Sequence, residues 1–561
     1  MPCREIKRIS EKAEFIYKYQ NLYFLLLYNF IIVFIIIMFC QPVYETSDDF
    51  AMGLISTGVY GEEYKQYLVF SNIIYGFLLK FLSNIILINW YIVLQYIIVA
   101  FSYSILFYLL YKKSCLGVAL FFNMLAWCFV GYEEIRLIQF TRTASIVCIV
   151  GLILLVYGII NSSFKSISVG FVMSLIGSFI RIECFWICLA YIIAFSVAYV
   201  VHDRKEINHS KKMIRMIFII VFSVTICSII DKAYYAADKG WKEYREYNTV
   251  RSYLLDLGIP SWEENQDKYE SIGFSQNDVI VLSQWIFNDS NKYTLENMNE
   301  IASWRTKKKI DVSFVRDFFK GLCGNLYNSI FYIAWIFSLI ILLSTRTKGG
   351  SVLSFLNFVG TIAIYFYLYY IGRIVARVEF GIWISAILIN FFAYFEFNKR
   401  EKLSSSNGYS YSKLSIILGT VLFLNVKIIA FDAPPIYENS TRDFLSYLAE
   451  NTQNLYVLDV RSFNGACFSF RPYKKADSFY MSNYCFSGEW GTFSPFSKEH
   501  NKKIGFDNPI EDLCTKDNVY YVANQDISFL LTYLQENYNV SSVELVETYN
   551  EYNIYKFYIV S

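Results

Sequence analysis

Long apolar runs recur along the chain, and short polar segments separate them. A helix needs about 20 apolar residues to cross the hydrocarbon layer of a bilayer. On this basis we predict about eleven crossings, at residues 21–40, 89–111, 116–131, 143–160, 167–180, 184–201, 216–233, 325–344, 351–371, 379–397 and 414–431.

A further apolar stretch, "YLVFSNIIYGFLLKFLSN" at residues 67–84, is interrupted by Asn72, Lys80 and Asn84. A helix with one apolar and one polar face lies along a membrane surface more readily than it spans the bilayer. We therefore interpret residues 67–84 as an interfacial helix that follows a first outer loop, residues 41–66.

Basic residues divide the connecting segments into two alternating sets. The N-terminal segment, residues 1–20, is basic, and so is every second loop after it: Lys112 and Lys113, Lys165, "HDRKEINHSKKMIR", Arg346 and Lys348, and "NKREK". Because loops rich in lysine and arginine stay in the cytoplasm, the N-terminus is predicted to lie inside. The basic stretch "RTKKK" (305–309) falls in a predicted outer loop, but long loops weigh little in this rule.

Two polar regions are long enough to fold outside the membrane. The large outer loop, residues 234–324, has a partly helical pattern. The tail, residues 432–561, has helix-then-strand patterns and ends in an alternating segment, "SVELVETYNEYNIYKFYIV", that predicts a hairpin. The predicted fold class is an α-helical polytopic membrane protein, with its transmembrane domain at 21–431 and a small extracytoplasmic α/β domain at 432–561.

The composition agrees with a membrane protein and excludes other classes. Hydrophobic residues make up 55% of the 561-residue chain and charged residues only 17%, a balance that is rare in a soluble domain. The net charge of +2 gives no basic field, so we expect no nucleic-acid partner. The cysteines form no CxxC pair and no cluster at zinc spacing. Of the three histidines, His202 and His209 lie in a predicted inner loop and His500 lies in the tail, so they do not form a catalytic site.

The charges near the predicted membrane level all lie at outer helix ends. They are Asp48, Asp49, Glu133, Glu134, Arg136, Arg142, Arg181, Glu183, Arg373, Arg377 and Glu379. Ionisable groups so close to hydrocarbon are costly unless they are paired or hydrated, so they mark functional sites by default. We predict one outer polar cavity that faces an amphipathic ligand. The structural alternatives are solvated carboxylates, ion pairs between helices and arginines that snorkel to the surface.

Arg373 and Arg377 are four residues apart, which predicts that they share one helix face. Two guanidinium groups on one face can clamp a phosphate, because each presents a planar fork of donors. Glu133 and Glu134 are predicted partners for the arginines. No Walker A motif or dinucleotide fingerprint occurs, so a lipid-linked substrate is favoured over a nucleotide.

In layout the chain resembles the GT-C superfamily of polytopic glycosyltransferases. The likeness rests on "ETSDDFA" just after the first crossing, on the interfacial stretch "YLVFSNIIYGFLLKFLSNIILINWY", and on many crossings followed by a soluble outer tail. The resemblance implies transfer of a sugar from a polyprenyl-phosphate carrier to a glycan or lipid acceptor of the cell envelope. The reaction would occur at the outer face of the cell membrane and invert the anomeric carbon.

The resemblance also implies roles for particular residues. Asp48 or Asp49 would act as general base on the acceptor hydroxyl. Arg373 and Arg377 would stabilise the leaving phosphate; the further substrate-binding candidates are Arg181, Glu183, Arg136, Glu133 and Glu134. A divalent metal at Asp48 and Asp49 is left open, because the superfamily includes both kinds of enzyme.

Three rival functions are weighed against this interpretation. A polysaccharide polymerase would rely on arginine-rich outer loops rather than an acidic first loop. A transporter or flippase would place charges near the bilayer midplane and use helices broken by glycine or proline. A receptor-like scaffold would not need Arg373 and Arg377 at membrane depth.

Overall fold

The structure is a computed structural model that describes residues 2–59, 64–203, 207–305, 310–328, 330–398, 439–463, 472 and 480–559. All structural statements below refer to this part of the chain. The crossing predicted at 414–431 and most of the "RTKKK" stretch lie outside it.

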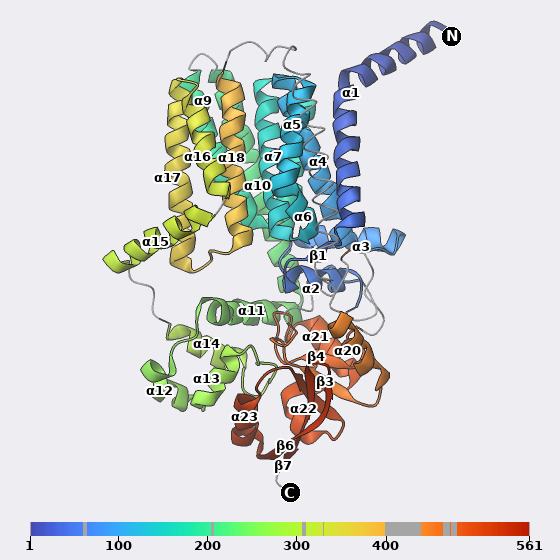
Figure 1. The fold of residues 1–561 in the computed structure, drawn as a ribbon, viewed down its shortest axis with the longest axis vertical. Helices are drawn as coiled ribbons and strands as arrows, with labels where there is room; N and C mark the ends of the chain where they lie inside the picture. Colours follow the sequence, from blue (N-terminus) through green and yellow to red (C-terminus); the bar gives the residue numbers. More distant parts are fainter. Residues whose placement is uncertain are drawn as a thin grey trace.

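Long helices stand side by side and form a bundle, which occupies the upper part of Figure 1. Its elements are α1 (Pro2–Phe39), α4 (Trp90–Lys113), α5 (Leu116–Ala126), the π-helix η1 (Trp127–Gly131), α6 (Tyr132–Arg136), α7 (Phe140–Ile160), α8 (Phe164–Ile180), α9 (Ile182–His202), α10 (Ile207–Ala237), α16 (Ile330–Leu343), α17 (Lys348–Ile371) and α18 (Ala376–Phe397).

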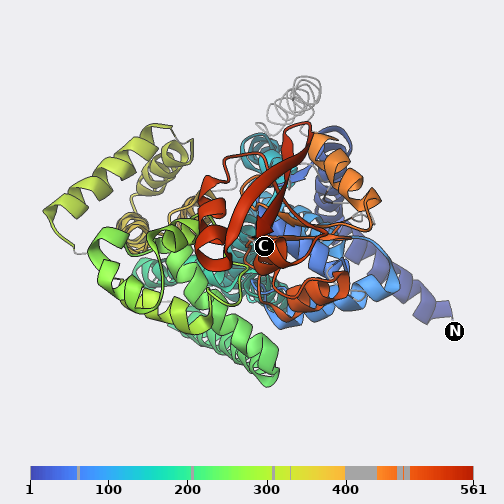
Figure 2. The same ribbon diagram turned by 90° about the horizontal axis from the view of Figure 1, so that it is seen from below.

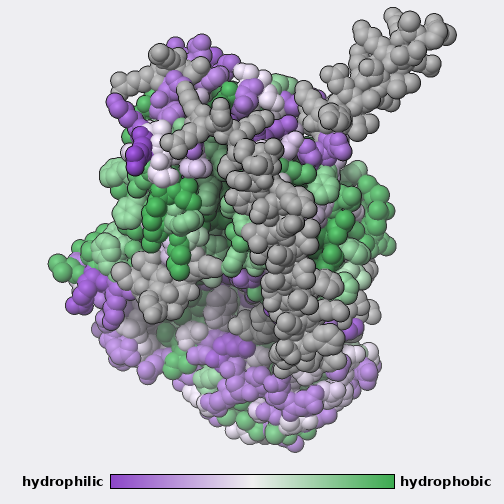
Figure 3. Space-filling view, turned by 45° about the horizontal axis from the view of Figure 1, so that its top comes forward, coloured by the Kyte–Doolittle hydropathy of each residue, from purple (hydrophilic) through white to green (hydrophobic). Residues whose placement is uncertain are grey.

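Eight helices in the described part are long and apolar enough to span a membrane, namely Gln20–Phe39, Trp90–Lys113, Leu116–Arg136, Phe140–Ile160, Ile182–His202, Asn208–Ala237, Lys348–Ile371 and Ala376–Phe397. Figure 3 shows the matching surface, a hydrophobic belt between two hydrophilic ends. The predicted α-helical membrane protein is confirmed in these terms. The crossings predicted at 167–180 and 325–344 fall on shorter apolar helices, Phe164–Ile180 and Phe331–Leu343, so the total of about eleven stays a prediction.

α7 forms the centre of the bundle. Its sequence is apolar on all sides, which is typical of a helix surrounded by other helices. Glycines allow its neighbour α8 to approach closely, because a Cβ on Gly151 would lie 2.7 Å from the backbone of Ser174 and a Cβ on Gly170 would lie 2.5 Å from that of Leu155. These close approaches hold α8 against the middle of α7.

Shorter elements lie crosswise beneath the bundle (Figure 1). They are β1 (Val43–Tyr44), α2 (Ser47–Ser56), α3 (Ile73–Ile85), β2 (Leu137–Ile138), α11 (Lys239–Leu257) and α15 (Val312–Asn328). β1 pairs in parallel with β2, which fixes the start of α2 next to the α6–α7 connection. The helix expected at 67–84 is α3, which begins later because the Asn72 side chain caps it by accepting from the backbone N–H of Ile74.

An α/β domain lies at the same end of the bundle. Its helices are α12 (Trp262–Ser271), α13 (Gln276–Ser283), α14 (Leu295–Ser303), α20 (Asn439–Glu450), α21 (Pro495–Ile504), α22 (Pro509–Thr515) and α23 (Ser528–Tyr538), and its strands are β3 (Leu455–Leu458), β4 (Tyr484–Phe486), β5 (Val519–Ala523), β6 (Val540–Tyr549) and β7 (Tyr552–Ile559). The sheet order is β4-β3-β5-β7-β6, in which β3 is parallel to β4 and β5. The predicted hairpin is the antiparallel pair β6–β7, which crosses the domain in the view from below (Figure 2).

The large outer loop and the tail share one hydrophobic core. Phe287 and Tyr293 from the loop pack in the same cluster as Val457, Tyr521 and Leu534 from the tail. The contact is also polar, because the buried Asp289 accepts hydrogen bonds from the hydroxyls of Tyr533 and Tyr538. These two regions, far apart in the sequence, therefore fold as one unit beneath the bundle.

The predicted inner loops and the predicted outer charges lie at opposite ends of the bundle. Because successive helices run up and down, the α4–α5, α7–α8, α9–α10 and α16–α17 connections all fall at the end far from the α/β domain (Figure 1). Those connections carry the basic residues Lys112, Lys113, Lys165 and Lys348. The orientation with the N-terminus inside and the α/β domain outside stays a prediction from this charge pattern.

Candidate active site

Asp49 lies in the first turn of α2 and faces the interior of the protein. Its side chain is fully buried. Its Oδ1 accepts hydrogen bonds from the Tyr91 hydroxyl at 2.8 Å and from the backbone N–H of Phe140 at 3.0 Å, and its Oδ2 accepts one from the Thr46 hydroxyl at 3.1 Å. Asp49 therefore ties the start of α2 to the starts of α4 and α7.

The protonation of Asp49 follows from this burial. Burial raises the pKa of Asp49 from 3.8 to about 8, although the hydrogen bonds from Tyr91, Phe140 and Thr46 lower it. At neutral pH the carboxyl group is therefore mostly protonated. A protonated carboxyl whose oxygens are both engaged is poorly placed to take a proton from a substrate.

Asp48 precedes Asp49 in the sequence but faces a set of arginines. Its side chain is 23% exposed, and its Oδ2 lies 3.6 Å from an Nη of Arg377. Burial raises the pKa of Asp48, whereas Arg377, Arg181 and Arg251 lower it. An accessible carboxylate with a raised pKa is suited to accept a proton. Of the two predicted acids, Asp48 is the one that a substrate can reach.

Arg373, in the link between α17 and α18, and Arg377, in the first turn of α18, point toward different carboxylates. Gly372 ends α17 with a φ of 73°, a left-handed conformation that favours glycine. Arg373 then lies in a non-helical link, and α18 begins only after it. The prediction that Arg373 and Arg377 share one helix face is therefore wrong. Arg373 instead pairs with Asp256, its Nη1 lying 3.0 Å from Oδ2.

α11 contributes two residues that the sequence did not single out. Asp256 lies between Arg373 and Arg251, whose Nη1 is 3.9 Å from Oδ1. Arg251 is buried, with its guanidinium 5.2 Å from the Trp285 ring centre, and this burial lowers its pKa. Nothing in the pattern "VRSYLLDLG" distinguishes these two charges from an exposed helix face, since only the tertiary fold brings α11 beneath the bundle.

We define the arginine cluster as four guanidinium groups and the carboxylates that face them, namely Arg181, Arg251, Arg373, Arg377, Asp48, Asp256 and Glu183. Arg181 pairs with Glu183 at 3.1 Å, and its guanidinium lies 4.9 Å from the ring centre of Phe140. Positive charges outnumber negative charges in the cluster. Arg373, Arg377 and Arg181 are each partly exposed, so their remaining N–H groups are open to an anion.

A second charged group surrounds Arg142 at the first turn of α7. Its Nε lies 3.0 Å from Oε2 of Glu45, and its two Nη atoms donate to Glu45 at 3.0 Å and to Glu133 at 2.9 Å. Two carboxylates therefore neutralise this one guanidinium. Glu133 was predicted to partner Arg373 and Arg377, but in the structure it pairs with Arg142. That predicted pairing is therefore wrong, because Arg373 and Arg377 contact aspartates instead.

Glu134 and Arg136 form none of the ion pairs described above, although Glu134 lies close enough to Arg142 for their charges to interact. Glu134 is fully buried within the bundle, and neither of its oxygens has a hydrogen-bond partner in the described part of the chain. Arg136 is half-buried beside Tyr132. Neither contacts Asp48 in the structure, so their predicted substrate-binding roles stay untested predictions.

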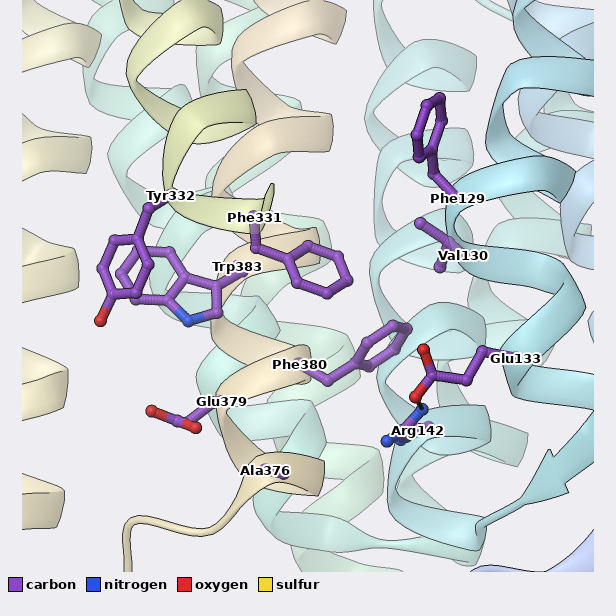
Figure 4. Close-up of a pocket in the computed structure, with 10 residues that line it drawn as sticks. All are labelled: Phe129, Val130, Glu133, Arg142, Phe331, Tyr332, Ala376, Glu379, Phe380 and Trp383. Carbon is purple, nitrogen blue, oxygen red and sulfur yellow. Dashed lines mark hydrogen bonds and ion pairs between the residues drawn. The ribbon is translucent and has the colours of Figure 1, made fainter. Parts of the chain in front are cut away.

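A cavity of about 280 Å³ lies between η1 and the helices α16 and α18 (Figure 4). Its lining is Phe129, Val130, Glu133, Arg142, Phe331, Tyr332, Ala376, Glu379, Phe380 and Trp383. Charged side chains line it at the end where α18 begins, and aromatic side chains from the start of α16 and from farther along α18 line the rest (Figure 4). Arg377, which contacts Asp48, follows Ala376 directly, so the cavity and the arginine cluster adjoin.

The structure gives no support for a metal between Asp48 and Asp49. Both oxygens of Asp49 are already hydrogen-bonded to Tyr91, Phe140 and Thr46. In the described part of the chain, no group of three or more histidines, cysteines, aspartates or glutamates could hold a metal ion. The chemistry of the site is therefore considered below through its own side chains.

Comparison with known proteins gives no relative: no family model, no curated protein and no solved structure matches this chain.

Proposed function

We propose that this protein is a glycosyltransferase of the cell membrane, resembling the GT-C superfamily, that transfers a hexose or pentose from a polyprenyl-phosphate carrier to a glycan or lipid acceptor at the outer face. The observation that carries the proposal is the contact between Asp48 and Arg377 at the end of the bundle. It brings together a carboxylate that can take a proton and a guanidinium that can hold a phosphate.

The arginine cluster would bind the phosphate of the donor. Its excess of positive charge favours a dianionic leaving group, and the partly exposed guanidiniums of Arg373, Arg377 and Arg181 each offer unused N–H donors. Negative charge grows on the phosphate as the bond to the sugar breaks. Fixed cations at that point stabilise the transition state more than the ground state.

Asp48 would act as the general base. It takes the proton of the acceptor hydroxyl, whose oxygen attacks the anomeric carbon of the sugar. The bond from that carbon to the phosphate oxygen breaks, and its electron pair leaves with polyprenyl phosphate. Attack opposite to the leaving group inverts the anomeric carbon. Burial raises the pKa of Asp48, and Arg377 beside it opposes that rise, so the guanidinium helps to keep the carboxylate ionised until the acceptor binds.

The test is sugar transfer by the purified full-length protein in lipid nanodiscs, supplied with a panel of labelled polyprenyl-phosphate sugars and a membrane lipid extract as acceptor. We expect one donor to be consumed. With that donor we expect Asp48→Asn to lower the rate by about 100-fold or more, the usual contribution of a general base.

Asp317→Asn is the matched control, because Asp317 is 54% exposed on α15 and lies outside the arginine cluster. It should transfer sugar at the wild-type rate. Consumption of no donor by the wild-type protein would refute the proposed function. Unchanged transfer by Asp48→Asn would refute the role of Asp48.

A further inference from the structure

The charge of the cavity between η1 and α18 differs in sign from that of the arginine cluster. Arg142 is the cation at its polar end, and Glu45 and Glu133 already neutralise it. Glu379 on α18 adds a third carboxylate to the same end. A phosphate would therefore be repelled from the cavity while it is attracted to the arginine cluster next to it.

Glu379 is an acid without a partner. It is half-buried in the cavity wall and makes no hydrogen bond or ion pair with any residue that the structure describes. Figure 4 shows its carboxylate projecting from α18 on the side away from the Arg142–Glu133 pair. A carboxylate held so close to hydrocarbon is costly unless a ligand or water satisfies it.

The apolar end of the cavity is built from aromatic rings in contact with one another, in tilted and edge-to-face arrangements. Trp383 and Tyr332 lie 4.2 Å apart between ring centres, and Phe331 and Phe380 lie 5.8 Å apart. Trp383 is seven residues beyond the first residue of α18, about 10 Å along the helix. A ligand that fills the cavity therefore has a polar head at the end of the bundle and an apolar part at the depth of the spanning helices.

The polar lining selects among possible heads. Arg142 retains N–H donors beyond those used by Glu45 and Glu133, while Glu133 and Glu379 offer acceptor oxygens. Hydroxyl groups both donate and accept, so they can satisfy both kinds of partner. A trimethylammonium head could be attracted by the carboxylates, but it has no O–H or N–H to donate to Glu133 or Glu379 and no oxygen to accept from Arg142, so it would leave these groups without hydrogen bonds.

We propose that this cavity binds a lipid with an uncharged, hydroxyl-bearing head. Under the proposed function, on which this assignment of a role rests, that lipid is the sugar acceptor. Glu133 and Glu379 accept from its hydroxyls, Arg142 donates to them, and Phe331, Phe380 and Trp383 pack against its chain. The donor phosphate stays at the arginine cluster, and Asp48 lies between that phosphate and the head of the bound lipid.

The test uses three photoactivatable dodecyl probes that share one chain and differ in the head: a glucoside, a phosphate and a trimethylammonium group. Each is crosslinked to the full-length protein in nanodiscs, and the labelled peptides are identified by mass spectrometry. We expect the glucoside to label residues 376–397 saturably and more strongly than the other two probes. Glu379→Gln should raise its half-saturation concentration about tenfold, as expected for the loss of a charged hydrogen bond.

Glu243→Gln is the matched control, since Glu243 is 52% exposed on α11; it should leave glucoside labelling unchanged. Labelling by the phosphate probe should instead weaken when Arg377 is replaced and should be unchanged in Glu379→Gln. Equal glucoside labelling of wild type and Glu379→Gln, or stronger labelling of residues 376–397 by the phosphate or the ammonium probe, would overturn the assignment. Because binding is measured without sugar transfer, the cavity can pass this test even if the glycosyltransferase proposal fails its own.

Discussion

Two neighbouring regions at one end of the bundle differ in how their charges are balanced. In the arginine cluster, guanidinium groups outnumber carboxylates and several are partly exposed. In the cavity, carboxylates outnumber the single guanidinium of Arg142, which is largely enclosed by its partners. The difference suggests two roles: the arginines of the arginine cluster bind an anion, whereas Arg142 stabilises the fold. Each prediction below tests that separation with a single substitution.

Arg142→Gln should have the largest effect, and the effect should be on stability. The change leaves Glu45 and Glu133 facing each other without the guanidinium that both now contact. Breaking a buried ion pair by removing one partner typically costs about 3–5 kcal/mol. Thermal unfolding of the purified protein should show a much lower midpoint. A midpoint equal to that of the wild type would mean that Arg142 is not a structural residue.

Arg377→Ala should lower the rate of sugar transfer and leave the stability of the protein nearly unchanged. Its side chain is 32% exposed and its contact with Asp48 is a long one, 3.6 Å, so little folding energy depends on it. Removing one cation from a developing oxyanion typically costs about 3 kcal/mol, a rate change of about 100-fold. Single-turnover transfer from the active donor measures this. A folded variant with the wild-type rate would remove Arg377 from the site.

Asp49→Asn should change the pH dependence of stability. The pKa of Asp49 is raised from 3.8 to about 8 by burial, so the folded state holds this proton more tightly than the unfolded state does. The resulting stabilisation is complete below about pH 4 and is lost as the pH rises through 8. Asparagine cannot ionise and loses no stability in this way. The thermal unfolding midpoint of Asp49→Asn should therefore rise relative to that of the wild type as the pH increases from 4 to 8. If the unfolding midpoints of the two proteins change with pH in the same way, Asp49 does not have the raised pKa assigned to it.

Arg373→Ala should have the smallest effect. The side chain is 46% exposed and pairs with Asp256 at 3.0 Å, and an exposed ion pair contributes at most about 1 kcal/mol. We expect an unfolding midpoint close to that of wild type and a several-fold higher KM for the donor. If only the KM for the acceptor changed, Arg373 would contribute to acceptor binding in the cavity and not to donor binding in the arginine cluster.

The sequence predicts the helical part of the fold well, because long apolar runs have few alternatives in a chain this hydrophobic. The hairpin of β6 and β7 is equally clear from its alternation. By contrast, the shared core of the large outer loop and the tail joins residues such as Phe287 and Val457, and no local pattern reveals a contact between segments so far apart.

The limits of prediction are similar within the candidate site. The sequence locates the acidic pair, yet it cannot tell Asp48 from Asp49, because burial depends on how α2 packs against α4 and α7. The predicted crossing at 351–371 ends where α17 ends, but the sequence did not show that α18 begins only at Ala376, so Arg373 was assigned to a helix that begins after it. Asp256 became a candidate only through the partners that the fold provides. Glu379 was already among the outer charges, but its role in the cavity follows only from the fold.

The most direct test of the account compares Asp48→Asn with Asp49→Asn in single-turnover sugar transfer, with both proteins purified and shown to be folded. Each substitution replaces one carboxyl group by an amide of the same shape. The account predicts that Asp48→Asn loses transfer while Asp49→Asn keeps a rate close to wild type at neutral pH. Loss of transfer by Asp49→Asn with an active Asp48→Asn would contradict it.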